Sequence, residues 1–182
     1  MKGIVFNLLE ESVRSEYGED TWDALLDAAH LNGAYTSLGT YPDSQLYAIV
    51  GAAAAALKLP PEAIVRWFGT RAAGMFAERY PDFFRPHQDT RSFLLTLNDI
   101  IHPEVRKLYP GAGVPHFDYQ SHSDGRLTMA YFSDRKLCAF AEGLIEGSAK
   151  HFGETVKIEQ PLCTIRGDSH CVLEIAFEKT RS

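Results

Sequence analysis

Through roughly its first hundred residues, the chain repeats apolar side chains with the period of an α-helix. Ile4, Val5, Leu8, Leu9 and Val13 fall at helical spacing, which predicts an amphipathic helix over residues 2–16. The same spacing, with prolines and capping residues between the runs, predicts more helices further along. The second helix begins at a cap at Asp20 or Thr21 and runs through about His30, and the third begins at Tyr41-Pro42-Asp43-Ser44 and includes the alanine run. The fourth covers residues 61–80, and the fifth extends from about Thr90 to Leu108.

After Tyr109-Pro110-Gly111 the pattern changes to that of strands. Asp124-Gly125 stands between the runs HFDYQSH and RLTMAYF, which is typical of a β-hairpin. Residues 137–152 return to helical spacing, and TVKIEQPLC and CVLEIAFEK alternate as two further strands. We therefore expect an α+β fold, with a helical N-terminal part followed by a four-stranded antiparallel sheet and a packed helix.

Composition and charge narrow the class of protein. The 182 residues suit one domain, and 45% hydrophobic with 23% charged residues is ordinary for a globular chain. A net charge of −6 argues against nucleic-acid binding. The start MKGIVFNLLEE has acidic residues after a short apolar run, unlike a signal peptide, and IVGAAAAALKLPP is too short to cross a bilayer. We expect a cytoplasmic location without membrane attachment.

The chain contains none of the common catalytic motifs. There is no P-loop, nucleophile elbow, glycine-rich dinucleotide loop or His-Glu-x-x-His sequence. We therefore expect a protein that is not an enzyme.

One histidine has an unusual position. His102 follows two isoleucines near the end of the predicted helix 90–108, and Pro103 follows it and removes a helical donor. On residue type alone, a buried core histidine is the favoured interpretation. The alternative is an axial ligand, because a neutral imidazole is what haem iron takes on its proximal side.

The segment YFSDR places three hydrogen-bonding groups at alternate positions. Tyr131 and Ser133 each carry a hydroxyl, and Arg135 has the planar guanidinium that suits a carboxylate. From the pattern alone, this is either a solvated strand edge or a site for an anionic group.

Several motifs together resemble the H-NOX family, the haem nitric oxide/oxygen-binding domains related to the haem domain of soluble guanylate cyclase. They are MKGIVFNLLE, GEDTW, HPEVRKLYPGAGVPHF, the Tyr-x-Ser-x-Arg motif and GLIEGSAKHF, in the family's order. The resemblance covers the whole chain and implies one stand-alone domain, 1–182, that binds haem b. It also implies a distal helical subdomain of about 1–60 and a proximal subdomain of about 61–182, with haem between the two parts.

The resemblance also assigns roles to residues. It implies His102 as the proximal iron ligand and Tyr131, Ser133 and Arg135 as clamps on the haem propionates. Pro115 matches the proline that presses on the haem face in this family, whereas His116 has no assigned role and is expected at the surface. The expected distal wall is apolar throughout and consists of Val5, Leu9, Ala72, Ala73, Phe76, Phe140 and Leu144.

Phe140 bears on which gas is bound. Oxygen-binding members of the family carry a tyrosine at this position, whose hydroxyl stabilises bound O2. Since an apolar wall offers O2 no such donor, we expect a sensor of nitric oxide that also binds CO. In the family, NO binding releases the proximal histidine, and a partner protein reads the change. The expected partner is a histidine kinase or a cyclic-di-GMP enzyme, as in bacterial relatives.

The chain has three cysteines, Cys138, Cys163 and Cys171, and an odd number argues against a disulfide framework. Some family members hold a structural zinc with three cysteines and a histidine. Here Gln160 stands where that histidine is expected, which leaves His170 or His151 as the fourth ligand. Unpaired buried thiols are the alternative. The competing function is a cysteine- or zinc-based redox regulatory protein in which haem is incidental or absent.

Overall fold

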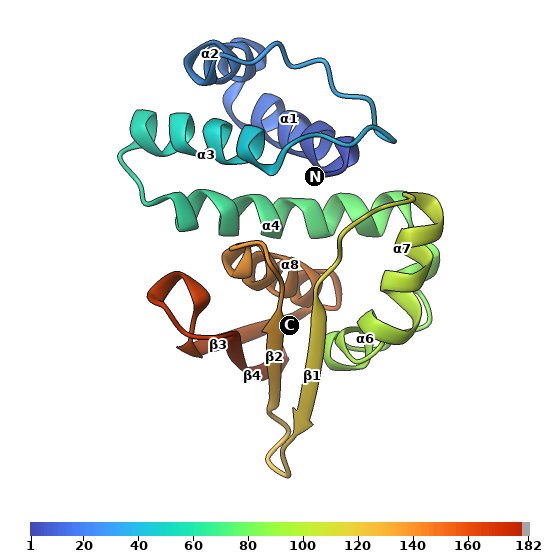
Figure 1. Cartoon of the computed structure of the whole chain (residues 1–182). Helices are drawn as coiled ribbons and strands as arrows, with labels where there is room; N and C mark the ends of the chain where they lie inside the picture. The colour runs from blue at the N-terminus through green and yellow to red at the C-terminus, as the bar shows by residue number, and fades with distance from the viewer. Residues whose placement is uncertain (180–182) are drawn as a thin grey trace.

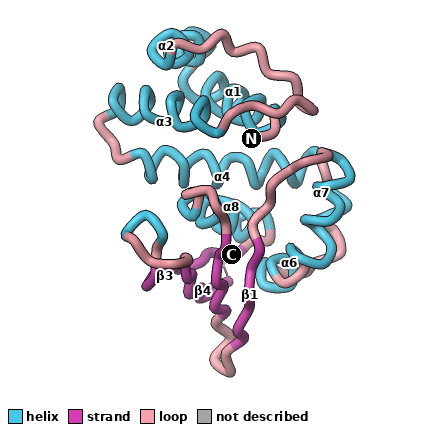
Figure 2. Tube along the Cα trace, in the orientation of Figure 1, coloured by secondary structure: helices cyan, strands magenta, loops and turns pink. Residues whose placement is uncertain are grey.

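The computed structural model describes residues 1–179, and Figure 1 shows its layers. Three helices form the outermost layer: α1 (Gly3–Tyr17), α2 (Glu19–Ala29) and α3 (Asp43–Leu57). The long helix α4 (Pro61–Arg79) lies beneath them. A loop connects α2 to α3, and its end pairs with the start of the chain through a bridge between Lys2 and Thr40 (Figure 2).

The predicted cap of α2 is wrong. Neither Asp20 nor Thr21 caps the helix, because Gly18 is the residue that separates α1 from α2. With φ at 92°, Gly18 adopts a backbone conformation that L residues rarely take, and its N–H donates to the carbonyl oxygen of Arg14. The second helix can therefore begin at once, at Glu19.

The predicted single helix from Thr90 to Leu108 is also wrong. The structure has α6 (Thr90–Leu94), a π-helical turn η1 (Leu97–Ile101) and α7 (His102–Leu108), preceded by an unpredicted short helix, α5 (Pro81–Phe84). Thr96 opens the π-helical turn, since its carbonyl oxygen accepts from both Ile100 N–H at 2.9 Å and Ile101 N–H at 3.1 Å. The turn ends directly before His102, which places this irregular backbone at the predicted iron ligand.

The sheet has the strand order β1-β2-β4-β3 and is antiparallel throughout, which confirms the α+β prediction. The expected hairpin joins β1 (His116–Ser121) to β2 (Leu127–Phe132), with Gly125 at φ 88° in its turn. The helix α8 (Cys138–His151) follows and packs between α4 and the sheet (Figure 1). The last two strands are β3 (Glu154–Leu162) and β4 (Cys171–Lys179), joined through the short 3-10 helix η2 (Thr164–Arg166).

The buried apolar residues form two clusters. One lies among α1 to α4, and the other lies among the sheet, α8 and the segment from α5 to η1. Most of the buried side chains of α4 contribute to the first cluster, whereas Ala77 belongs to the second. The division of the chain near residue 60 stays a prediction. Within residues 1–179, no single helix is long and apolar enough to cross a membrane. The pair α3 and α4 passes that test only together, across a bend of 110°.

Candidate functional site

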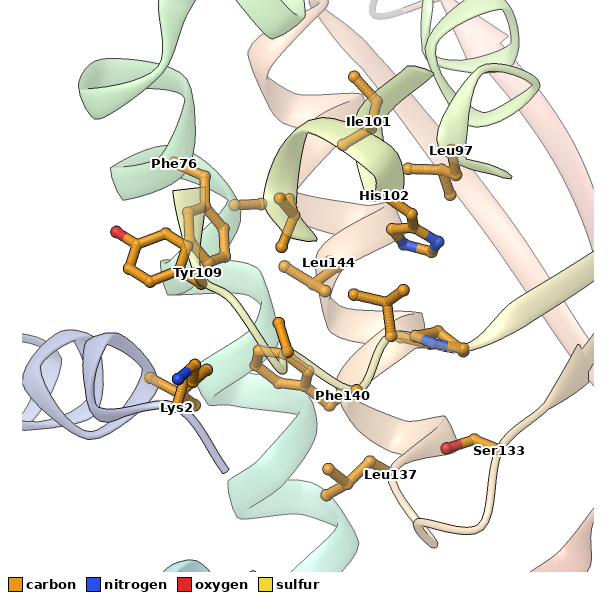
Figure 3. Close-up of a pocket in the computed structure, with 18 of the residues that line it drawn as sticks. Lys2, Phe76, Leu97, Ile101, His102, Tyr109, Ser133, Leu137, Phe140 and Leu144 are labelled. Atoms are coloured by element: carbon orange, nitrogen blue, oxygen red, sulfur yellow. The ribbon is translucent and has the colours of Figure 1, made fainter. Parts of the chain in front are cut away.

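A largely apolar cavity of about 290 Å³ lies between the two clusters (Figure 3). This volume is near the lower end of ordinary ligand pockets, about 300–1,000 Å³. Its wall combines the start of the chain, the C-terminal half of α4, the α6–α7 segment, β1, β2 and α8. The predicted haem-site residues that line it are Val5, Ala73, Phe76, His102, Pro115, Tyr131, Ser133, Arg135, Phe140 and Leu144.

His102 presents a neutral imidazole to this cavity. Burial, assisted by the positive charge of Arg106, lowers the pKa of His102 to about 4, so the ring is uncharged at neutral pH. Its Nδ1 atom is buried and has no hydrogen-bond partner within residues 1–179. Figure 3 shows the ring on the inner side of its helix, facing the space that leads toward Leu144 and Phe140. A buried nitrogen without a partner fits a ligand better than a core histidine whose hydrogen bonds are made.

Two residues at the end of the HPEVRKLYPGAGVPHF motif, Pro115 and Phe117, lie beside the His102 ring. Pro115 lines the cavity beside it. Phe117, the next residue but one, stacks on the imidazole with ring centroids 5.9 Å apart and an interplanar angle of 29°. Phe117 is almost completely buried and belongs to the second apolar cluster, so the imidazole rests on a rigid surface.

The residues of the Tyr-x-Ser-x-Arg motif lie together at one edge of the cavity. Tyr131 is 3% exposed, and burial raises its pKa to about 12, so the phenol keeps its proton and remains a donor. Ser133 Oγ accepts a hydrogen bond of 3.1 Å from the Arg135 N–H. Arg135 Nε donates to Asp43 Oδ2 at 2.6 Å, and Nη1 donates to the Gly113 carbonyl oxygen at 2.6 Å. These bonds fix the guanidinium at the cavity edge.

Asp43 and Gly113 were not identified from the sequence. Asp43 opens α3, far along the chain from Arg135, and only the folded chain brings the two together. Burial alone would raise the pKa of Asp43, but the hydrogen bonds from the N-terminal ammonium and from Arg135 together lower it. At Gly113 a β-carbon would stand 2.7 Å from Arg135 Nη1, so glycine leaves room for the guanidinium.

The predicted wall residues that line the cavity are apolar, but two of the expected members lie elsewhere. Leu9 and Ala72 are 2% and 0% exposed and belong to the first apolar cluster rather than to the cavity wall. Helical spacing identifies the buried side of α1 and α4 but cannot tell which buried residues border a cavity. Phe140 does reach the cavity, and its ring contacts Phe68 with centroids 5.1 Å apart.

A pair of tyrosines closes another part of the wall. The hydroxyls of Tyr80 and Tyr109 share a short hydrogen bond that joins the ends of α4 and α7. Burial, together with this bond, raises the pKa of Tyr109 to about 12. Figure 3 shows the Tyr109 hydroxyl directed away from His102, so it offers no donor to a ligand opposite that residue. No sequence motif indicated this pair.

The three cysteines also meet. The sulfur atoms of Cys138, Cys163 and Cys171 lie within 4.8 Å of one another, and all three residues are buried. His170 and His151, the predicted fourth ligands, are outside this group. His170 stacks on the ring of Phe132, whereas His151 packs against two phenylalanines. The surface expectation for His116 is confirmed, since its side chain is 65% exposed.

The cysteines differ in their protonation. Burial raises the pKa of Cys138 to about 12. For Cys163, burial is outweighed by hydrogen bonds from the backbone N–H groups of Ile165 and Arg166 and from the Cys138 thiol, so the pKa is lowered. Cys171 Sγ accepts from the Thr164 N–H at 3.3 Å. Hydrogen bonds donated to a sulfur atom stabilise its thiolate form, which is the form that ligates a metal. A closed zinc site nevertheless requires a fourth ligand.

The cavity fits a large flat apolar group with an acidic edge. A neutral imidazole with an unpartnered Nδ1 atom faces one side, apolar side chains face the other, and a guanidinium and two hydroxyls lie at the rim. These are the groups that hold haem iron and its two propionates. Fold and cavity together define a domain of the class of haem-based gas sensors.

Comparison with known proteins identifies the family. The family model for haem-NO-binding domains matches residues 2–160. An H-NOX protein from Shewanella oneidensis in the Fe(II)NO ligation state superposes with a TM-score of 0.93 at 35% identity, covering 98% of this chain and 100% of that one. The chain belongs to the haem-NO-binding, or H-NOX, family, which confirms the resemblance seen in its sequence.

Two further structures are similar. The H-NOX from Shewanella woodyi in the Fe(II)CO ligation state, bound to IWP-051, has a TM-score of 0.82 at 32% identity and covers 97% of this chain and 94% of its own. The unliganded Fe(II) H-NOX from K. algicida has a TM-score of 0.86 at 27% identity, with 100% and 98% covered. The match therefore includes both the helical part and the sheet.

Proposed function

We propose that the protein is a sensor of nitric oxide that binds haem b in the cavity and signals to a partner protein through release of His102. The observation that carries the proposal is the position of His102, with an unpartnered Nδ1 atom, opposite an apolar wall and beside the Tyr131-Ser133-Arg135 edge. Ferrous haem supplies a metal that binds diatomic gases. The side chains of this protein would bind the haem, orient it and shape the gas site, and we propose no catalytic role for any of them.

His102 would hold the iron through its neutral imidazole, and the stacked ring of Phe117 would fix its orientation. Arg135 would hold a propionate through the remaining donors of its guanidinium, with Asp43 keeping that group in place. The protonated phenol of Tyr131 and the hydroxyl of Ser133 would donate to the same carboxylates.

The distal wall supports selectivity for NO, with CO as a second ligand. Phe76, Phe140 and Leu144 line the cavity, and none of these side chains carries a hydrogen-bond donor. Bound O2 depends on such a donor, whereas NO and CO depend on it much less. The two Shewanella relatives were solved with NO and CO on ferrous iron, which supports the same ligands here.

The proposed output is an interaction with a histidine kinase or a cyclic-di-GMP enzyme in the cytoplasm. The His102 segment supports this mode of signalling because η1 and α7 lie at the periphery of the molecule (Figure 1). Their exposed apolar side chains include Ile100 and Leu108. A shift of this segment would change the shape of a surface to which a partner protein can bind.

The electronic spectrum of the reduced protein tests the proposal. We expect a Soret band that shifts when NO is added and that is lost in His102→Ala and recovered with imidazole. His116 is an exposed histidine close to His102 in the sequence, so His116→Ala is the matched control and should have the same spectrum as the wild-type protein. A colourless protein, or a His102→Ala variant with the wild-type spectrum, would refute the proposed role.

We also propose that Cys138, Cys163 and Cys171 supply three ligands of a structural zinc, with a fourth from outside the cluster. The proposal is supported by the proximity of their sulfur atoms and by the N–H donors that two of them receive. Zinc near one equivalent in protein purified without chelator, and its loss in Cys171→Ser, is the expected result. Zinc far below one equivalent rejects the site and leaves unpaired buried thiols.

A further inference from the structure

Asn98 joins the π-helical turn to the edge of the sheet. Its side-chain Nδ2 donates to the Phe117 carbonyl oxygen at 2.6 Å, and its Oδ1 accepts from the Phe117 N–H at 3.1 Å. β1 is an edge strand, so its outward backbone groups have no neighbouring strand. At Phe117, the side-chain amide of Asn98 makes the two backbone hydrogen bonds that a neighbouring strand would otherwise make.

The residue that Asn98 holds is central to the site. Phe117 stacks on His102, and in the β1–β2 ladder it stands opposite Tyr131, with ring centroids 5.7 Å apart. Asn98 itself precedes His102 by one helical turn. One pair of hydrogen bonds therefore connects the backbone that carries His102 to the strand on which its ring rests.

The backbone around Asn98 is poorly supported from within. The turn is π-helical, with the His102 N–H donating to the Leu97 carbonyl oxygen, and Pro103 has no N–H to continue the pattern. Such a segment deforms more easily than a regular α-helix. Asn98 makes two hydrogen bonds between the π-helical turn and β1, and Tyr119 adds one from its hydroxyl to the Leu94 carbonyl oxygen at the end of α6.

We propose that Asn98 is a positioning residue that ties the His102 segment to β1 and thereby promotes release of His102 when NO binds. An imidazole on a segment that is tied to the sheet cannot follow the iron when the iron is drawn away, so the bond between the iron and His102 would break before the segment shifts. Without the tie, the segment follows and His102 stays bound. This inference rests on the proposed haem-based sensing of NO.

The test uses Asn98→Leu, which keeps the side chain's size and removes both hydrogen bonds. In the haem-loaded protein we expect the ratio of His102-free to His102-bound NO complex to fall at least about tenfold, at unchanged haem content. We also expect the Phe117 amide to exchange with deuterium at least about tenfold faster. Asn32→Leu, which removes an amide that bonds only within the exposed α2–α3 loop, is the matched control and should change neither value.

A merely structural role would lower the melting temperature and leave the ratio of the two NO complexes at its wild-type value, which would overturn the proposal. Unchanged exchange at Phe117 would overturn the tie itself. If Asn98→Leu does not fold, Asn98→Asp retains the acceptor for the Phe117 N–H and loses the donor, and a smaller fall in the same ratio is expected. If the wild-type protein takes up no haem, the proposed function fails, and the Phe117 amide exchange alone decides whether Asn98 ties the segment.

Discussion

Phe140→Tyr should convert this protein from one that rejects O2 into one that binds it. Phe140 lines the cavity opposite His102, and the substitution adds a single hydroxyl to a ring whose surroundings are otherwise unchanged. The backbone at Phe140 cannot shift easily, because its carbonyl oxygen packs against Gly69, where a β-carbon would clash. The contact with Phe68, at 5.1 Å between ring centroids, also holds the ring in place.

The size of the effect follows from the hydrogen bond. Bound O2 carries partial negative charge, and a bond to a charged acceptor contributes about 1.5–3 kcal/mol. Each 1.4 kcal/mol changes an equilibrium constant about tenfold, so the O2 affinity should rise about 10- to 150-fold. The affinity for CO should change far less, because CO depends little on such a bond.

Oxygen titration of the reduced protein, followed by its absorption spectrum, measures this change. Phe132→Tyr adds the same hydroxyl to an exposed ring outside the cavity and should leave the O2 affinity unchanged. If the wild-type ferrous protein already forms a stable complex with O2 in air, the reasoning from Phe140 is refuted. Equal affinities of wild type and Phe140→Tyr would refute it as well.

Other substitutions test a support of the site, the packing of α4 against α8 and the pH dependence of stability. Asp43→Asn removes the carboxylate that holds Arg135 Nε at 2.6 Å, so haem transfer to a scavenging apoprotein should speed up about tenfold; an unchanged rate would show that the carboxylate is dispensable. Gly143→Ala places a β-carbon against a backbone carbonyl oxygen of α4 and should lower the free energy of unfolding by about 1–3 kcal/mol, measured with urea. Gly74→Ala, in open space on α4, should cost nothing or stabilise by up to about 1 kcal/mol, and equal losses in the two variants would contradict the close helix contact. Burial raises the pKa of Glu142 above its ordinary value of 4.5, so the folded protein binds more protons than the unfolded chain just above that pH, and stability falls as pH rises through this window. Glu142→Gln should flatten that slope in denaturation curves recorded from about pH 4 to 7, and an identical slope would show that Glu142 does not cause it.

Much of the fold could be predicted from periodicity. The apolar spacing of the first four helices, the Asp-Gly hairpin and the alternation in β4 all correspond to elements of the structure. The predicted edge formed by Tyr131, Ser133 and Arg135 also lies on the same cavity as His102. These features are local or belong to short motifs, which is why one sequence is sufficient to find them.

The remaining features depend on contacts between distant residues. A helical pattern continues through Leu97–Ile101, and only hydrogen bonding reveals the π-helical turn. Asn98 looks like any polar residue on a helix until the fold places it beside Phe117. The same is true of Asp43 beside Arg135. Such partners carry no sequence signature because either residue alone is commonplace.

The spectrum of the reduced protein during titration with NO tests the central claim most directly. The account predicts a Soret band before NO is added, and a spectrum after addition that matches haem whose bond to His102 is broken. His102→Ala should bind haem only when imidazole is supplied. A protein without a Soret band, or one whose NO complex keeps the bond to His102, would contradict the account.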